Sequence, residues 1–102
     1  MSPASKDKIQ QIIDNHGVVV FSKSYCPYCQ ATKALLQESG ANAHVIELDE
    51  IDDGSEMQNN LQEMTGQRTV PNIFIGRKHI GGNSDLQARK NELPQLLKSI
   101  KS

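Results

Sequence analysis

The sequence predicts an α/β fold in which helices flank a mixed sheet of four strands. The first observation is a helical pattern between two short apolar runs, residues 18–22 and 44–48, which is the order of a parallel βαβ unit with a right-handed crossover. The second is a pair of apolar runs, NIFI and KHIG, on either side of Gly76-Arg77, which predicts an antiparallel hairpin. Together these patterns predict the chain order αβαβαββαα.

The first half of the chain predicts a helix, a strand and a second helix. Gly17 is the expected C-cap of an N-terminal helix. Residues 18–22 (VVVFS) form a β-branched run bounded by turn signals, as in a buried strand. A second helical pattern runs from about Pro27 to Ser39, and Gly40 ends it. The expected core positions are Ile9, Ile12, Ile13 and His16 in the first helix and Ala31, Leu35 and Leu36 in the second.

The middle of the chain predicts a half-buried strand and a third helix. Residues 44–48 (HVIEL) alternate between apolar and polar side chains. After an acidic loop, Ser55 and Gln58 have the spacing of a capping box, and Gly66 is the expected end of the helix. The apolar positions of this helix, at i, i+4 and i+7, are Met57, Leu61 and Met64.

The last third predicts a hairpin followed by two short helices. Gly76 at the first of two loop positions fits a type II′ turn. Ser84 and Gln87 form a second candidate capping box, and Pro94 is tolerable in the first turn of the final helix. The apolar positions of that helix are Leu93, Leu96, Leu97 and Ile100.

Length and charge exclude several classes of protein. At 102 residues we expect a single domain over 1–102, and such a chain buries roughly two-thirds of its unfolded surface without disulfide staples. The 11 basic and 12 acidic residues nearly balance, so neither nucleic acid nor a membrane is indicated as a partner. The first residues, MSPASKDKIQQ, lack the apolar core of a secretory signal, so we expect a reducing, cytoplasmic setting. We also expect a monomer.

The only two cysteines stand in the stretch SKSYCPYCQ, where the first strand meets the second helix. If Pro27 opens the helix, Cys26 is its N-cap, where unpaired backbone N–H groups and the helix dipole favour a thiolate. Lys23 adds a cation nearby. Cys29 lies almost one turn further on and should be less exposed and hold its proton more firmly. Cys26 would then attack a disulfide, and Cys29 would release the captured half.

Three other interpretations of CPYC are weaker. A static disulfide over so short a loop would add little stability and would be reduced in the cytoplasm. Zinc takes four ligands, whereas CPYC supplies two, so we expect no bound metal. Inert core thiols usually lie in an apolar run. A C-x-x-C beside a βαβ pattern is typical of a redox pair, which we prefer. The histidines, scattered along the chain, are His16, His44 and His79.

Two further motifs suggest parts of a binding site. In TVPNIFI, Pro71 either marks the start of a strand or forms a cis bond with Val70 that leaves the Val70 backbone facing an extended peptide. In GGNSDL, Ser84 and Asp85 stand at the start of a helix, where they either cap it or bind a carboxylate and an ammonium group. Both alternatives stay open from these residues alone.

In this order and spacing, CPYC after Lys23, then TVP, then GGNSDL resemble the dithiol glutaredoxins over nearly the whole chain. The resemblance implies a thioredoxin-like fold and a cis proline at Pro71. It also implies Cys26 as the nucleophile and Cys29 as the resolving cysteine. The implied glutathione-binding residues are Lys23 and Gln67 at the glycine carboxylate, Tyr28 beside the groove, Thr69, Val70 and Pro71 along the cysteinyl portion, and Ser84 and Asp85 at the γ-glutamyl end.

The resemblance further implies a glutathione-dependent thiol–disulfide oxidoreductase acting on glutathione mixed disulfides and protein disulfides. The implied partners are glutathione as co-substrate, glutathionylated or disulfide-containing proteins and, indirectly, glutathione reductase, with no tightly bound cofactor. Two alternatives stay open. Some glutaredoxins hold a [2Fe–2S] cluster between two protomers, typically with Gly or Ser where Pro27 stands here. A thioredoxin-type reductase is the other, although the chain has no tryptophan and Tyr25 precedes the first cysteine.

Overall fold

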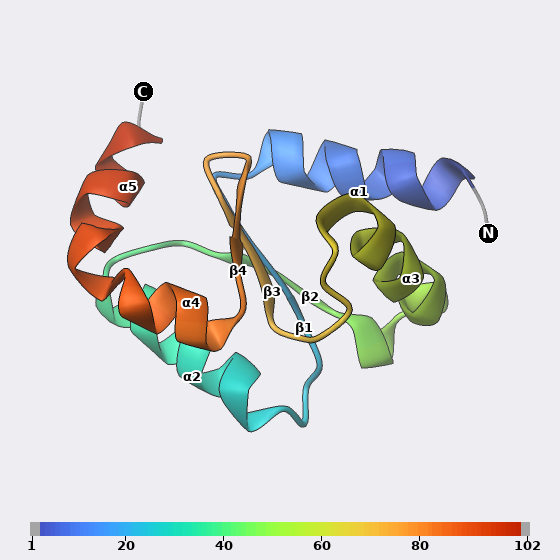
Figure 1. Ribbon diagram of the computed structural model, residues 1–102, viewed down its shortest axis with the longest axis horizontal. Coiled ribbons are helices and arrows are strands. Elements are labelled where there is room, and N and C mark those ends of the chain that lie inside the picture. Colours follow the sequence, from blue (N-terminus) through green and yellow to red (C-terminus); the bar gives the residue numbers. More distant parts are fainter. Residues whose placement is uncertain (1–2, 101–102) are drawn as a thin grey trace.

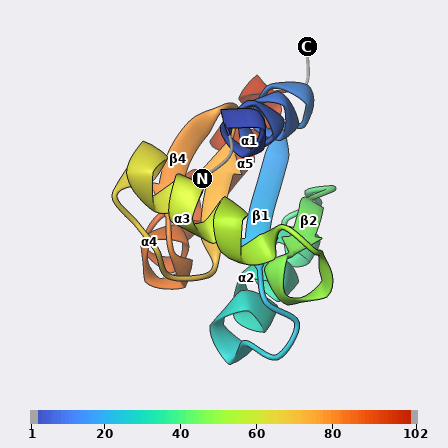
Figure 2. The same ribbon diagram turned by 90° about the vertical axis from the view of Figure 1, so that its right-hand side faces the viewer.

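The computed structural model of the protein describes residues 3–100 and shows a four-stranded mixed sheet in the order β2-β1-β3-β4 (Figure 1). The central strand β1 (Val18–Ser22) runs parallel to β2 (His44–Glu47) and antiparallel to β3 (Asn72–Ile75). Strand β4 (Lys78–Gly81) pairs with β3 as the second arm of a hairpin. Figure 2 shows β2 and β4 at opposite edges of the sheet. The predicted α/β class and mixed sheet are therefore confirmed.

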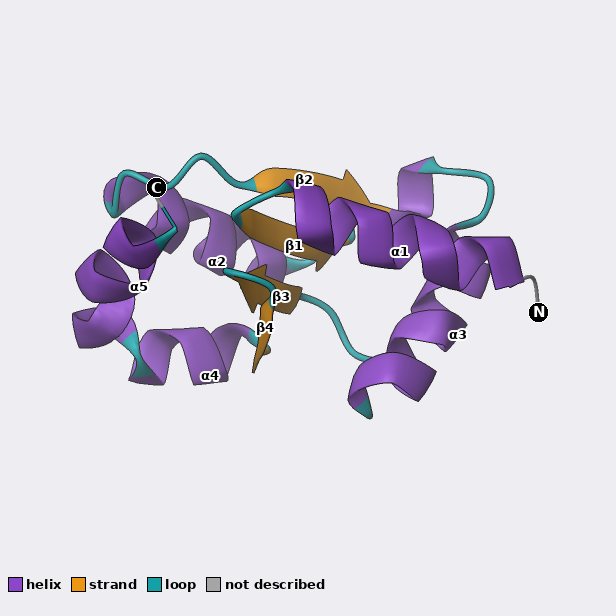
Figure 3. Ribbon diagram, turned by 90° about the horizontal axis from the view of Figure 1, so that it is seen from above, coloured by secondary structure: helices purple, strands orange, loops and turns teal. Residues whose placement is uncertain are grey.

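Helices cover both faces of the sheet (Figure 3). The pair α1 and α3 packs on one face, and α2, α4 and α5 pack on the other. Short 3₁₀ turns connect β2 to α3 and α4 to α5. The bounds are α1 Pro3–Asn15, α2 Pro27–Glu38, η1 Leu48–Glu50, α3 Gly54–Thr65, α4 Asn83–Ala88, η2 Lys90–Glu92 and α5 Leu93–Ser99.

Strand β1 is buried from both sides, which explains its unbroken apolar run. Val18 and Val20 join a core cluster with side chains of α2, α4 and α5, whereas Val19 and Phe21 join a second cluster with side chains of α1 and α3. Successive side chains of a strand point to opposite faces, so this one strand contributes to both cores. In the second cluster the rings of Phe21 and Phe74 meet edge to face, with centroids 6.0 Å apart.

The first helix is shorter than predicted. It ends at Asn15, so neither His16 nor Gly17 belongs to it, and Gly17 lacks the left-handed backbone of a C-cap. The reason is a tertiary contact, because the Gly17 carbonyl accepts the N–H of Gly76 in the hairpin turn at 2.8 Å. The ring of His16 stacks on that of His44 at a centroid distance of 3.8 Å. This segment is therefore shaped by its neighbours instead of by helix propensity.

Glycine ends the next two helices as predicted. Gly40 and Gly66 follow α2 and α3 with φ values of 81° and 82°, the left-handed conformation that suits glycine. The buried stripe of α2 differs from the prediction, since Ala31 is exposed and Thr32 faces the interior. Burial of Thr32 is tolerated because its hydroxyl donates a hydrogen bond to Oδ1 of Asn83 at 2.9 Å.

The predicted capping box at Ser55 and Gln58 is wrong. Helix α3 begins at Gly54 with Asp53 as its N-cap, so Ser55 lies inside the first turn. The Gln58 side chain instead donates through Nε2 to the carbonyl of Arg68 at 2.9 Å, across to the loop that follows the helix. The predicted apolar stripe is buried at Met57 and Leu61 and exposed at Met64.

The predicted capping box at Ser84 and Gln87 is also displaced. Helix α4 begins at Asn83, and its N-cap is Gly82. Asp85, not Gln87, reaches back and accepts the N–H of Gly82 at 2.8 Å. The helix start therefore sits two residues earlier than predicted and has only half of a capping box: glycine has no side chain to accept, and the carboxylate at the third helical position bonds the N-cap backbone.

The hairpin turn is of type I′ instead of the predicted type II′. Both central residues, Gly76 and Arg77, have positive φ, at 58° and 68°. A type II′ turn has positive φ at its first central residue alone, whereas type I′ has it at both. The twist of a type I′ turn matches that of the paired strands β3 and β4, which offsets the strain at Arg77.

The remaining boundaries lie close to those predicted. Strand β2 ends at Glu47, and Leu48 begins η1. Helix α5 begins at Leu93 with Pro94 in its first turn, and Leu97 is buried beneath it. No helix within residues 3–100 is long and apolar enough to cross a membrane.

Candidate active site

Cys26 is the N-cap of α2, as the sequence predicts. Its backbone is extended (φ −87°, ψ 118°), and Pro27 opens the helix at a position where the missing N–H breaks no hydrogen bond. The backbone N–H of Cys29 donates to Sγ of Cys26 across 3.3 Å. One N–H of the helix terminus is thus directed at the sulfur, which lies at the positive end of the helix dipole.

The two sulfurs differ sharply in exposure. Cys26 is half-buried, whereas Cys29 is buried with 0% of its surface exposed. Burial raises the pKa of the Cys29 thiol and the neighbouring Cys26 raises it further, while hydrogen bonds involving the Lys23 backbone and the Ser22 hydroxyl act in the opposite direction. Cys26 is therefore placed to attack an external disulfide, and Cys29 stays protonated beneath it.

Asp49 anchors the loop between β1 and α2, a role that the sequence analysis missed. Its carboxylate accepts the hydroxyl of Ser24 and also the backbone N–H of Ser24, the latter at 2.9 Å. These hydrogen bonds, with a smaller contribution from the charge of Lys23, hold the pKa of Asp49 below its usual value. In the same loop the N–H of Cys26 donates to the Lys23 carbonyl at 3.0 Å. Asp49 follows β2, so the pairing of β2 with β1 brings it here.

The Val70-Pro71 peptide bond is cis, the isomer that the second interpretation of TVP requires. It lies beside Cys26 because Phe21, near the end of β1, pairs with Asn72 at the start of β3. The carbonyl oxygen of Val70 is 4.0 Å from Sγ of Cys26. An extended peptide that reaches Cys26 therefore meets the backbone of Val70.

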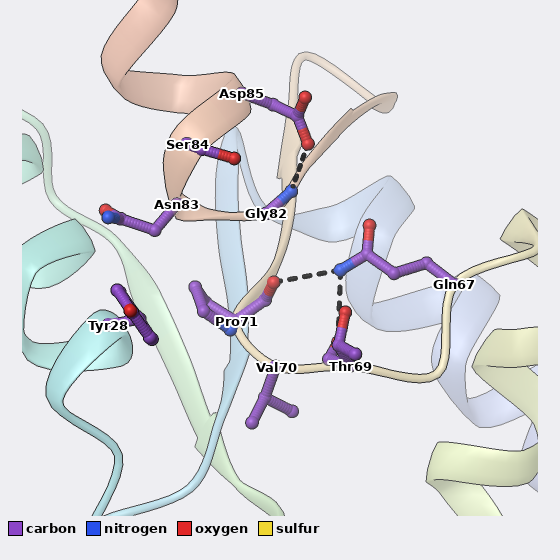
Figure 4. Close-up of a pocket in the computed structure, with 9 residues that line it drawn as sticks. All are labelled: Tyr28, Gln67, Thr69, Val70, Pro71, Gly82, Asn83, Ser84 and Asp85. Carbon is purple, nitrogen blue, oxygen red and sulfur yellow. Dashed lines mark hydrogen bonds between the residues drawn. The ribbon is translucent and has the colours of Figure 1, made fainter.

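A groove of about 530 Å³ opens beside the cis proline, between α2 and the start of α4 (Figure 4). All the predicted binding residues line it except Lys23, which lies in the loop before Cys26. Gly82 and Asn83 line it without having been predicted, although both belong to the GGNSDL motif that indicated their neighbours. The lining residues are Tyr28, Gln67, Thr69, Val70, Pro71, Gly82, Asn83, Ser84 and Asp85.

The α4 wall of the groove depends on glycine. Gly81 has a φ of 120°, and a Cβ at this position would lie 2.3 Å from Oδ2 of Asp85. Glycine therefore leaves room for Asp85 to fold back onto the N–H of Gly82 (Figure 4). Next to it, Asn83 accepts the hydroxyl of Thr32, which ties α4 to the helix that carries both cysteines. The wall thus presents a carboxylate on a scaffold that is braced against α2.

Gln67 lines the groove as predicted, but its amide group is engaged by the protein. Nε2 of Gln67 donates to the carbonyl oxygens of Thr69 and Pro71, each at 3.0 Å (Figure 4). An amide nitrogen carries two hydrogens, so both are used. A hydrogen bond from Gln67 to a ligand carboxylate therefore requires one of these two bonds to be released.

Comparison with known proteins identifies the family. A sequence model described as Glutaredoxin matches residues 18–80, which is more than half of the chain and includes both cysteines and the cis proline. The chain belongs to the glutaredoxin family. Glutaredoxins are glutathione-dependent oxidoreductases, and the predicted thioredoxin-like fold is confirmed by their solved structures.

Plant glutaredoxins are among the similar sequences. A glutaredoxin from Vernicia fordii is 60% identical over 75 residues, which cover 74% of this chain and 72% of that protein. Glutaredoxin-C2 from Arabidopsis thaliana is 57% identical over 75 residues, which cover 74% of this chain and 68% of that protein. The similarity therefore extends beyond the CPYC motif to most of both chains.

Solved glutaredoxin structures superpose closely on this one. The complex of buckwheat glutaredoxin with glutathione has a TM-score of 0.92 and 43% identity, and the match covers 94% of this chain and 89% of that one. The holo form of glutaredoxin C1 from Populus tremula x tremuloides has a TM-score of 0.90 and 46% identity, covering 94% and 97%. This glutaredoxin therefore shares its backbone with a protein that was solved with glutathione.

The difference between the two thiols predicts selective alkylation. Brief treatment of the reduced, folded protein with iodoacetamide near pH 7.5 should modify Cys26. The alkylation rate of Cys29 should be lower by about tenfold or more, because Cys29 is buried and its pKa is raised. Peptide mass spectrometry after timed quenching measures both rates.

The single-cysteine variants serve as controls. Cys29→Ser should react as fast as Cys26 does in the wild type, and Cys26→Ser should react slowly until it is unfolded. Equal rates for the two thiols in the folded wild type would contradict the assignment of Cys26 as the nucleophile.

Proposed function

We propose that this glutaredoxin reduces mixed disulfides between glutathione and thiol-bearing substrates. The Cys26 thiolate attacks the glutathionyl sulfur, forms a disulfide with glutathione and expels the substrate as a thiolate, which takes up a proton. The thiolate of a second glutathione then attacks the bound glutathionyl sulfur, forms glutathione disulfide and returns Cys26 as a thiolate. The net reaction converts the mixed disulfide and one glutathione into the substrate thiol and glutathione disulfide.

The juxtaposition of Cys26 and Val70 carries this proposal. Sγ of Cys26 lies 4.0 Å from the Val70 carbonyl, and the groove begins at the same cis-proline loop. A glutathionyl group whose cysteinyl portion lies along the Val70 backbone would present its sulfur to Cys26. The structure of buckwheat glutaredoxin with glutathione, which has the same backbone, supports a ligand of this kind.

The charges at the groove also fit glutathione, which has two carboxylates and one ammonium group. At the α4 end, Asp85 would pair with the ammonium and Ser84 would donate to the γ-glutamyl carboxylate. At the other end, Lys23 and Gln67 would face the glycine carboxylate, with Gln67 releasing one of its bonds to the backbone. Tyr28, which is 67% exposed, would flank the ligand.

Protein disulfides would be reduced through both cysteines. Cys26 would capture one half of the substrate as a mixed disulfide. The Cys29 thiol, giving up its proton, would then attack Sγ of Cys26, and the half released as a thiolate would take up a proton. Cys29 is placed for this step, because its own N–H already contacts Sγ of Cys26. Two glutathiones would then reduce the Cys26–Cys29 disulfide, and glutathione reductase would restore the glutathione.

Two cysteine variants test the monothiol route. Cys26→Ser should abolish the glutathione-dependent reduction of a small glutathione mixed disulfide. Cys29→Ser should retain the activity and is expected to raise it, because Cys29 only diverts Cys26 into an internal disulfide on this route. A steady-state assay coupled to glutathione reductase measures both.

The outcomes separate the alternatives. Loss of activity in both variants would favour the dithiol route and a thioredoxin-type reductase. An inactive wild type would overturn the proposed function altogether.

The charge of Asp85 provides a second test. Asp85→Asn keeps an oxygen that can accept the Gly82 N–H but removes the negative charge, so the KM for the mixed disulfide should rise about tenfold. The matched control is Glu92→Gln, because Glu92 pairs with Arg89 beyond the groove. Equal KM values for wild type and both variants would show that Asp85 does not bind the ammonium group.

Iron–sulfur cluster binding is the second candidate function, and the holo form of the similar glutaredoxin C1 favours testing it. Within residues 3–100, no group of three or more His, Cys, Asp or Glu side chains could hold a metal ion. One chain would therefore offer a single outward thiol, Cys26, and a cluster would need a second chain and glutathione thiols. Pro27 stiffens the turn at this thiol.

The test is the visible absorption and mass of protein purified without oxygen in the presence of glutathione. A coloured dimer that loses its iron when Cys26→Ser is introduced would establish the cluster. A colourless monomer that reduces the mixed disulfide would contradict cluster binding and support the oxidoreductase function.

A further inference from the structure

Asn72, the first residue of β3, directly follows TVP and is a buried polar side chain to which the sequence analysis assigned no role. It is 1% exposed, and both ends of its amide group have partners. Nδ2 donates to the carbonyl of Gln67 at 3.3 Å, and Oδ1 lies 2.7 Å from Nε2 of His79 on β4. A buried amide with fixed partners at both ends joins the hairpin to the loop that lines the groove.

The partners of Asn72 determine where the proton of His79 sits. The Gln67 carbonyl can only accept, so the Asn72 amide must direct Nδ2 toward it and Oδ1 toward His79. Oδ1 can only accept, and therefore Nε2 of His79 carries the hydrogen. Burial lowers the pKa of His79, although Asp85 acts in the opposite direction. The direction of both hydrogen bonds, from His79 to Asn72 and from Asn72 to Gln67, is thus defined.

The backbone N–H, the backbone carbonyl and both side-chain amide hydrogens of Gln67 all form hydrogen bonds within the protein. Its N–H donates to Oγ1 of Thr65 at 3.0 Å, and its carbonyl accepts from Asn72. Its two amide hydrogens bond the carbonyls of Thr69 and Pro71. These two carbonyls stand on either side of Val70, whose own carbonyl lies against the nucleophile. The position of the Val70 peptide is therefore set through Gln67 (Figure 4).

We propose that His79 is a positioning residue of the active site. In the free protein it orients Gln67 through Asn72, and Gln67 holds the backbone on both sides of Val70 in the conformation that first meets the glutathionyl group, before one of its two bonds is released to the ligand carboxylate. The proposal rests on the proposed function insofar as Val70 pairs with that group. The main role of Gln67 in the free protein is then to brace the cis-proline loop. His79, on the hairpin, contributes to substrate binding through that loop.

His79 is an exposed residue whose inward contacts are the hydrogen bond between Nε2 and Asn72 and the ring contact with Phe74, so the two can be altered separately. His79→Phe keeps a ring beside Phe74, now 5.1 Å away between centroids, and removes the N–H donor. His79→Gln restores a donor at about the position of Nε2. His16→Phe is the matched control, since His16 is an exposed histidine stacked on His44 and does not line the groove.

The experiment measures kcat and KM for a small glutathione mixed disulfide and records the ¹H–¹⁵N spectra of the free proteins. In His79→Phe, KM should rise about fivefold with kcat within about twofold, because one neutral hydrogen bond is lost from the brace. The side-chain amide signals of Gln67 and the backbone signal of Val70 should shift. In His79→Gln and His16→Phe, both KM and these signals should stay near the wild-type values.

Two results would overturn the proposal. One is a His79→Phe variant with unchanged KM and unchanged Gln67 signals. The other is an equal rise of KM in His79→Phe and His79→Gln, which would point to a loss of packing instead of a lost donor. A wild type that is inactive with glutathione would overturn the proposed function, while the Gln67 and Val70 signals would still decide whether His79 positions the loop.

Discussion

The pairing of Phe21 with Asn72 in the antiparallel β1–β3 ladder is the constraint on which the site depends. Strand β1 leads to Cys26, and β3 begins directly after Pro71, so this register sets the two loops opposite each other. A slip by one residue would turn every side chain of a strand to the other face, moving Phe74 out of its core cluster. Burial of the central strand on both faces therefore determines the distance between the nucleophile and the cis-proline loop.

The same strand-to-helix connection gives two thiols opposite properties. Cys26 occupies the N-cap, where it is half-buried and receives a backbone N–H from the first turn. Cys29 lies one turn deeper against the core, where burial raises its pKa. A single motif thus separates a partly exposed sulfur from a buried one. The separation follows from the direction of the helix, which points its N-terminus outward and its third residue inward.

Side chains outside the three motifs hold the site from two sides. Asp49 anchors Ser24 in the loop before the nucleophile, and Gln67 and Asn72 brace the loop that contains the cis proline. Sequence inspection predicted a ligand contact for Gln67 and assigned no function to Asp49 or Asn72. A polar residue at the end of a strand gives no local signal of its partner, because that partner is set by which strands become neighbours.

Local sequence determined the elements whose cause lies within a few residues: the strand of VVVFS, the N-cap at Cys26 and the glycine ends at Gly40 and Gly66. The motifs also predicted most of the groove lining. Tertiary structure decided the end of α1, the true N-caps of α3 and α4, and the isomer of the Val70-Pro71 bond. In these places several local conformations are close in energy, and contacts with distant segments choose among them.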